Sequence, residues 1–179
     1  MNKNLNNIAI AGIIAALLLI PQTILEFLRG ANKLTGNLLP VYIIVTIIGV
    51  LTYIYFVWGF KIIGDKTKNK LLIVSSYLLI IATIAFYIVS FILEGGSALT
   101  QALFGVGIIV LLGAVSIPFG IGLLKLKKQF GAIATAAGVL NIISGVSFVT
   151  VILAFIGLLV MIPLIVLEIV LMFKAAKKL

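Results

Sequence analysis

The feature that most constrains this chain is a series of apolar runs that are too long for a soluble fold of its size. Residues 71–93, for example, contain no charged side chain. A helix of about 20 residues crosses the roughly 30 Å hydrocarbon core of a bilayer. A mean hydropathy of +1.41 shows that such runs dominate the chain. The sequence therefore predicts an integral membrane protein.

The same runs predict the type of secondary structure. A membrane-spanning barrel would need segments of about ten residues that alternate apolar and polar side chains, because one strand face meets lipid and the other a lumen. The runs here are continuous and rich in Ile, Leu, Ala and Gly. Such segments suit helices, whose backbone groups are satisfied internally. We expect an all-α integral membrane protein with one transmembrane domain over residues 1–179.

The lengths of the runs predict six transmembrane helices. The tract over 130–173 is about twice as long as one crossing, so we expect it to form a hairpin. Small residues from Ser144 to Ser147 place its reversal between residues 145 and 151. The first run is too long for a cleavable signal core and is predicted to be an uncleaved helix. The expected spans are 8–28, 38–63, 71–93, 98–124, 130–147 and 151–173.

The distribution of charge predicts the orientation of these spans. Of the 13 basic residues, only Arg29 and Lys33 fall in loops on the side opposite the N-terminus, where Glu26 and Glu94 also lie. An excess of lysine and arginine in short loops marks the cytoplasmic side. We therefore expect three hairpins in a prokaryotic cell membrane, with both termini cytoplasmic. The lysine-rich inner loops are also expected to contact anionic lipid headgroups.

The composition excludes several kinds of chemistry. The chain has no cysteine and no histidine, which removes thiolate and imidazole metal sites, histidine proton relays and a cysteine nucleophile. No cofactor is implied, and no soluble basic domain is present that would bind nucleic acid. Serine with lysine is the only nucleophile and base pair on offer, and the lysines lie at the inner surface while most serines lie deeper. We do not expect an enzyme.

Glu168 is the one carboxylate that the predicted spans place within the hydrocarbon region. It lies roughly 9 Å from the flanking Lys174, because a helix rises 1.5 Å per residue. An ionisable residue at this depth is a candidate proton or cation site inside the bundle. Alternatively, it pairs with Lys125 or Lys127 of a neighbouring helix or reaches headgroup level. Since a lone acid makes a poor proton relay, we expect one of these two roles, pairing or headgroup contact.

The most polar stretch within an apolar span lies between residues 141 and 150. Asn141 and Ser144 are three residues apart and share one helix face. They would line a polar cavity or, as we expect, tie helices together by hydrogen bonds worth roughly 0.6 to 2 kcal/mol each. Small residues at close-packing spacing indicate helix contact, within the chain or with another subunit. These are Ala134, Ala137, Gly138 and Gly145.

Three prolines fall inside predicted spans and are candidate helix kinks: Pro21, Pro118 and Pro163. A proline lacks the N–H that would bond the carbonyl four residues earlier. Discontinuous helices in transporters use freed carbonyls to hold ions. Kinks that only shape helix packing are the expected role, because nearby polar side chains can satisfy the freed groups.

Three segments carry a resemblance to a known family. They are the inner-loop stretches 59–70 and 127–134 and the closing stretch 168–178, each combining a helix end with a short basic run. In these segments the chain resembles archaeal multi-pass membrane proteins of an uncharacterised family, domain of unknown function 996. The resemblance implies a polytopic membrane protein and brings no activity or catalytic residue with it.

Two functions are compatible with these observations. The first is a non-enzymatic accessory or scaffold subunit that packs against a protein partner, or against itself as a homo-oligomer, through its small-residue faces. The alternative is a small transporter or channel for an ion or small solute, with contacts from Asn141, Ser144 and Glu168 and from the kinked helices. The sequence favours the first. An internal polar path lined by those three side chains would favour the second.

Overall fold

The structure is a computed structural model that describes residues 2–31, 33–93 and 97–179. Glu94, predicted in an outer loop, lies outside these residues. The described segments are helical and contain no strand. In chain order the helices are α1 (Lys3–Gly30), α2 (Leu38–Thr67), α3 (Lys70–Ile92), α4 (Ala98–Leu124), α5 (Lys127–Phe130), α6 (Ala132–Val149) and α7 (Ala154–Lys178).

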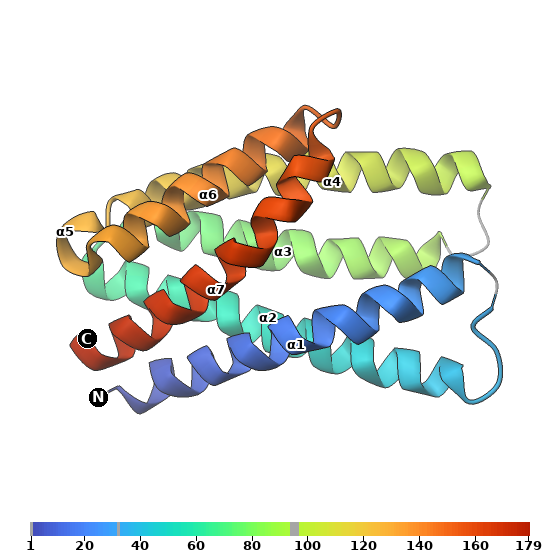
Figure 1. Cartoon of the computed structure of the whole chain (residues 1–179), viewed down its shortest axis with the longest axis horizontal. Helices are drawn as coiled ribbons and strands as arrows, with labels where there is room; N and C mark the ends of the chain where they lie inside the picture. Colours follow the sequence, from blue (N-terminus) through green and yellow to red (C-terminus); the bar gives the residue numbers. More distant parts are fainter. Residues whose placement is uncertain (1, 32, 94–96) are drawn as a thin grey trace.

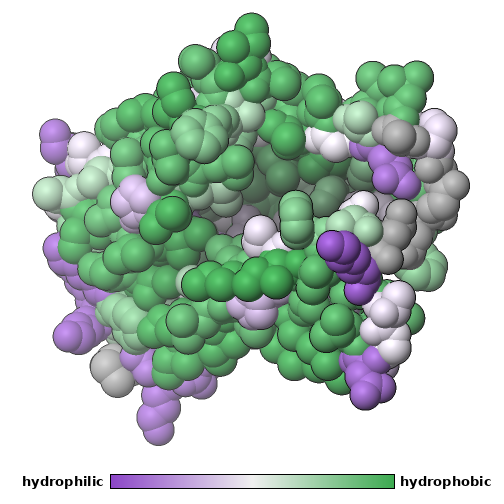
Figure 2. All heavy atoms as spheres, turned by 45° about the vertical axis from the view of Figure 1, so that its right-hand side comes forward, coloured by the Kyte–Doolittle hydropathy of each residue, from purple (hydrophilic) through white to green (hydrophobic). Residues whose placement is uncertain are grey.

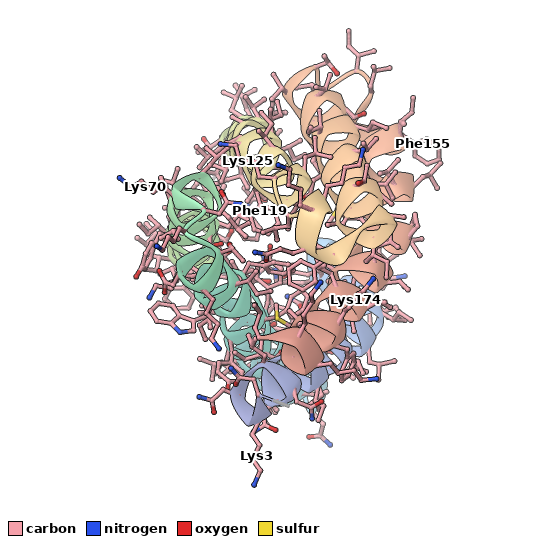
Figure 3. The ribbon with its side chains drawn as sticks, turned by 90° about the vertical axis from the view of Figure 1, so that its left-hand side faces the viewer. Lys3, Lys70, Phe119, Lys125, Phe155 and Lys174 are labelled. Atoms are coloured by element: carbon pink, nitrogen blue, oxygen red, sulfur yellow. The ribbon has the colours of Figure 1, made fainter. Side chains whose placement is uncertain are left out.

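Six of these helices, all except α5, are long and apolar enough to cross a membrane. The predicted all-α class with six membrane-length helices is therefore confirmed. Their outward faces are apolar: Phe91 on α3 is 75% exposed, and Phe155 on α7, 70% exposed, points away from the bundle (Figure 3). The face in Figure 2 is mostly hydrophobic, with hydrophilic residues gathered towards its edges. Lipid is the solvent that such a surface requires.

Capping side chains set several helix starts. The side chain of Asn2 accepts a hydrogen bond from the Leu5 amide, and Ser97 accepts one from Thr100. These bonds satisfy amide groups that a first turn leaves without a partner. Asn69 caps α3 in the same way and also donates its amide to Gly122 O on α4 at 2.7 Å. The short α2–α3 loop is thereby fixed to the neighbouring helix.

The connection between α6 and α7 occupies residues 150–153 and overlaps the predicted turn only at its end. Ser144, Gly145 and Ser147 lie inside α6 and are buried. Small residues allow close helix packing as well as turns, and here they serve packing. The reversal uses Val151 with a positive φ of 58°. A second break, at Gly131 with φ of 69°, separates α5 from α6 in a conformation that glycine adopts without strain.

The six long helices form a closed ring. Each packs against its two neighbours in the order α1, α2, α3, α4, α6 and α7, and α7 returns to α1. Both termini lie at the same end of the bundle (Figure 1). There the Asn2 amide donates to Ala176 O at 2.7 Å, which joins the two terminal helices. We call this arrangement the six-helix ring.

The contact between α4 and α6 is built on two pairs of facing glycines. A Cβ added to Gly113 would lie 2.7 Å from Gly145 O, and one added to Gly120 would lie 2.7 Å from Gly138 O. The backbones approach too closely for any side chain, which maximises van der Waals contact where lipid offers no hydrophobic driving force. Ala134 and Ala137 on α6 are also fully buried. The small-residue face of α6 thus packs within the chain.

The best-packed part of the core fills the terminal end of the ring. Phe60 is 1% exposed and lies edge-on to both Phe56 and Phe119, with centroid separations of 5.3 and 5.2 Å. Leu5 and Ile8 of α1 are equally buried beside them in the same cluster. Figure 3, which looks along the bundle from this end, labels Phe119 among the helices. We call Phe56, Phe60 and Phe119 the aromatic plug.

Candidate functional site

The six-helix ring encloses a cavity of about 270 Å³, and every one of its helices contributes lining residues. The cavity begins at the aromatic plug and extends away from the terminal end. Figure 2, which brings the opposite end of the bundle forward, shows a hollow near the centre of that face. Water-sized space inside a membrane bundle is where polar side chains are expected to serve function.

Asn141, Ser144 and Glu168 lie together on this cavity, at the contact between α6 and α7. Asn141 Nδ2 donates to Glu168 Oε1 at 2.8 Å and to Ala137 O at 3.1 Å. The Ser144 hydroxyl is 3.5 Å from Gly157 O on α7. The bonds to Glu168 and Gly157 connect α6 to α7, whereas the bond to Ala137 lies within α6. Asn141 and Ser144 also line the cavity. The two roles considered for them, joining helices and lining a polar cavity, are therefore compatible.

Pairing with a lysine, one of the two expected roles of Glu168, is not seen among the described residues. Among the described residues the ion pairs are Glu26 with Arg29 at 3.3 Å and Lys61 with Asp65 at 2.7 Å. Lys174, six residues beyond Glu168, donates to Phe130 O at 2.9 Å. Lys66 and Lys178 also donate to backbone carbonyls at the terminal end. Glu168 lies deeper, and its partner is the side-chain amide of Asn141.

A second polar pair, which the sequence analysis did not single out, lines the cavity from α1 and α3. Gln22 Nε2 donates to the Tyr87 hydroxyl at 2.5 Å. The two helices lie on either side of α2, and the bond passes over Gly49, where an added Cβ would be 2.9 Å from Gln22 Oε1. One feature of the sequence could have pointed to this pair: Gln22 is the only amide side chain in the predicted span 8–28.

Polar contacts continue along α1 beyond Gln22. The Tyr42 hydroxyl donates to Glu26 Oε1 at 2.8 Å and accepts from Arg29 Nη1 at 2.7 Å. Glu26 is four residues after Gln22, hence about 6 Å further along the helix. Polar groups therefore extend from the cavity towards the end of the bundle opposite the termini.

The remaining cavity wall is apolar and combines aliphatic with aromatic side chains. Tyr53, Phe86, Tyr87 and Phe148 line it above the aromatic plug. Phe86 also stacks on Phe104 with an interplanar angle of 6°. The cavity thus combines one carboxylate and a few neutral polar groups with several aromatic faces.

The three prolines within the helices do not line the cavity. Helices α1, α4 and α7 continue through Pro21, Pro118 and Pro163, and none of the three lines the cavity. Ser116, beside Pro118, does line it, but donates its hydroxyl to Leu112 O at 2.8 Å. That carbonyl is not the one that Pro118 frees. The structure therefore places the prolines outside the site, and their kinks remain predictions.

No family model, curated protein or solved structure matches this chain. The resemblance to the archaeal family accordingly remains a prediction. What the chain does must be inferred from its own geometry: a ring of six membrane-length helices around a cavity that carries a carboxylate.

Proposed function

We propose that this chain is a small transporter that binds a solute in the cavity of the six-helix ring and passes it across a prokaryotic cell membrane. The observation that carries the proposal is the convergence of Asn141, Ser144 and Glu168 on one internal cavity. A structure with those side chains against lipid would have removed the idea. Membrane-midplane sites lined by several helices are the usual place for substrate in transporters.

The proposed topology is three hairpins with both termini in the cytoplasm. The pairs α1–α2, α3–α4 and α6–α7 are consecutive in sequence and in contact. Lysines from different helices lie at the end that carries the termini, among them Lys3, Lys70, Lys125 and Lys174 (Figure 3). The positive-inside rule assigns that end to the cytoplasm. Lysines there would also meet anionic lipid headgroups.

In this orientation the aromatic plug separates the cavity from the cytoplasm. To open the cavity to the cytoplasm, Phe60 would have to move away from Phe56 and Phe119. The opposite end of the bundle would close at the same time. Such alternating access proceeds by rocking of helix groups around a fixed site. The α4–α6 glycine contact suits a rigid half of the bundle, because its backbones pack directly on each other.

The scaffold role has less support in this geometry. It rested on a small-residue face free to pack on a partner, and Gly138 and Gly145 pack on α4 of the same chain. The apolar outer surface needs only lipid to cover it. A partner protein or a homo-oligomer is therefore not required by the fold.

Flux into proteoliposomes tests the transport proposal. The purified chain would be reconstituted and exposed to a panel of small cationic, neutral and anionic solutes, with uptake followed by light scattering or solid-supported-membrane currents. We expect at least one class to enter faster than into protein-free liposomes, and Glu168→Gln to change that rate. Asp65→Asn, at an exposed acid near the end of α2 and outside the cavity lining, is the matched control. Uptake equal to that of empty liposomes for every solute would contradict transport.

A further inference from the structure

We infer that the cavity takes a monovalent organic cation, namely an amine or quaternary ammonium group attached to a small apolar body. This inference rests on the proposed function and names its substrate class. It follows from the one charge on the cavity wall, from the aromatic side chains that line the same cavity and from the cavity volume.

The charge of the cavity is set by Glu168. Among the described residues that line it there is no lysine or arginine, and Glu168 is the only acid. An isolated carboxylate in a bundle interior is costly unless a counter-charge or hydrogen bonds compensate it. Asn141 supplies one hydrogen bond to Oε1. A bound cation would supply the counter-charge, whereas an anion would be repelled.

The aromatic wall favours an organic cation over a metal ion. Calcium and magnesium require six or more oxygen ligands, and this cavity is lined mainly by apolar and aromatic side chains. Tyr53, Tyr87 and Phe148 are among the aromatic residues that line it. A cation held over an aromatic face gains electrostatic attraction, which grows when water is excluded. Quaternary ammonium ligands are the usual occupants of aromatic cages. The apolar body of the ligand would contact Leu79 and Leu164.

The volume limits the size of the ligand. About 270 Å³ is close to the lower end of the range for small-molecule sites, roughly 300–1,000 Å³. It equals about nine water volumes of roughly 30 Å³. A single small ammonium compound fits this space, whereas a lipid or a peptide does not.

Competition binding tests the inference. The chain in nanodiscs would be incubated with radiolabelled benzyltrimethylammonium, and unlabelled compounds would compete. Choline and its uncharged isostere 3,3-dimethyl-1-butanol form a matched pair, and benzylsulfonate is the anionic probe. We expect the two cations to bind, and the alcohol and the sulfonate to compete at least tenfold more weakly. Glu168→Gln should weaken cation binding at least about 30-fold, since a buried charge loses its partner.

The controls separate this inference from loss of folding and from the proposed function. Asp65→Asn should bind as the native chain does, and Glu168→Gln should keep the native elution volume and helical circular dichroism. Tyr53→Leu should weaken the cation several-fold and leave the alcohol unchanged. Equal binding of choline and its isostere, or no cation binding at all, would overturn the inference. Uptake of a neutral solute in the flux assay would then still support transport.

Discussion

Asn141 on α6 donates its side-chain amide to the carboxylate of Glu168 on α7, 27 residues later in the chain, at 2.8 Å. The same nitrogen is 3.1 Å from Ala137 O, one turn earlier on α6. The amide is therefore fixed by its own helix and in turn positions Glu168 on the cavity wall. This relationship connects the packing of the last two helices to the candidate site.

Breaking this bond from one side should cost more than removing both partners. We expect Asn141→Leu to destabilise the chain by about 1–3 kcal/mol, because a buried carboxylate loses its donor. The double variant Asn141→Leu, Glu168→Leu should cost less than the sum of the two single changes. Thermal unfolding in mild detergent measures both. Asn37→Leu, at an exposed position without a side-chain cap bond, is the control, and strict additivity would contradict the coupling.

The glycine pairs between α4 and α6 should tolerate no Cβ. Gly120→Ala or Gly138→Ala would place a methyl group 2.7 Å from a backbone carbonyl oxygen, and overpacking of this kind costs roughly 1–3 kcal/mol. Gly107 lies on α4, as Gly120 does, and a Cβ added there would have no neighbouring atom within 4 Å. Gly107→Ala should therefore be neutral or slightly stabilising. Unfolding temperatures of the three variants decide the matter. Equal effects at Gly107 and Gly120 would show that the helices do not approach this closely.

The aromatic plug should contribute strongly to stability. Phe60→Ala removes a fully buried ring between two aromatic neighbours, and such truncations cost about 3–5 kcal/mol. Phe27→Ala removes a ring that is 76% exposed and should cost much less. The same detergent unfolding assay compares the two. A Phe60 variant as stable as the Phe27 variant would place Phe60 on the lipid-facing surface instead.

The orientation can be read with reporter fusions. Green fluorescent protein fused after Leu179 should fluoresce, because that end is predicted to be cytoplasmic. Alkaline phosphatase fused within residues 33–37, between α1 and α2, should be active on the outer side. The opposite pattern at both sites would invert the topology, and with it the side from which the cavity is reached.

The sequence predicted the helices better than the site. The expected spans 71–93 and 98–124 nearly coincide with α3 and α4 because polar residues such as Asn69 and Ser97 mark their starts. The α6–α7 connection was misplaced by several residues because Thr150 to Leu153 is itself largely apolar, and the small residues before it serve packing. Hydropathy alone does not distinguish small residues in a turn from small residues at a helix contact.

The cavity required the three-dimensional arrangement. Asn141 and Ser144 were recognisable from their spacing, but their meeting with Glu168 depends on how α6 and α7 pack. The bond between Gln22 and Tyr87 joins residues 65 apart in the chain and depends on the space that Gly49 leaves. The predicted pairing of Glu168 with Lys125 or Lys127 was wrong because those lysines lie nearer the terminal end of the bundle.

The most direct test of a solute cavity is the reaction of single cysteines with a water-soluble thiol reagent. The chain has no cysteine, so Ser116→Cys and Leu111→Cys can be compared without a background. Ser116 on α4 lines the cavity and is half-buried. Leu111 on the same helix does not line the cavity and is 44% exposed.

In intact cells treated with a membrane-impermeant methanethiosulfonate from outside, we expect Ser116→Cys to react and Leu111→Cys to stay unmodified. The thiolate that reacts forms in water and not in lipid. No reaction at position 116, with or without reaction at position 111, would contradict a solvent-accessible cavity.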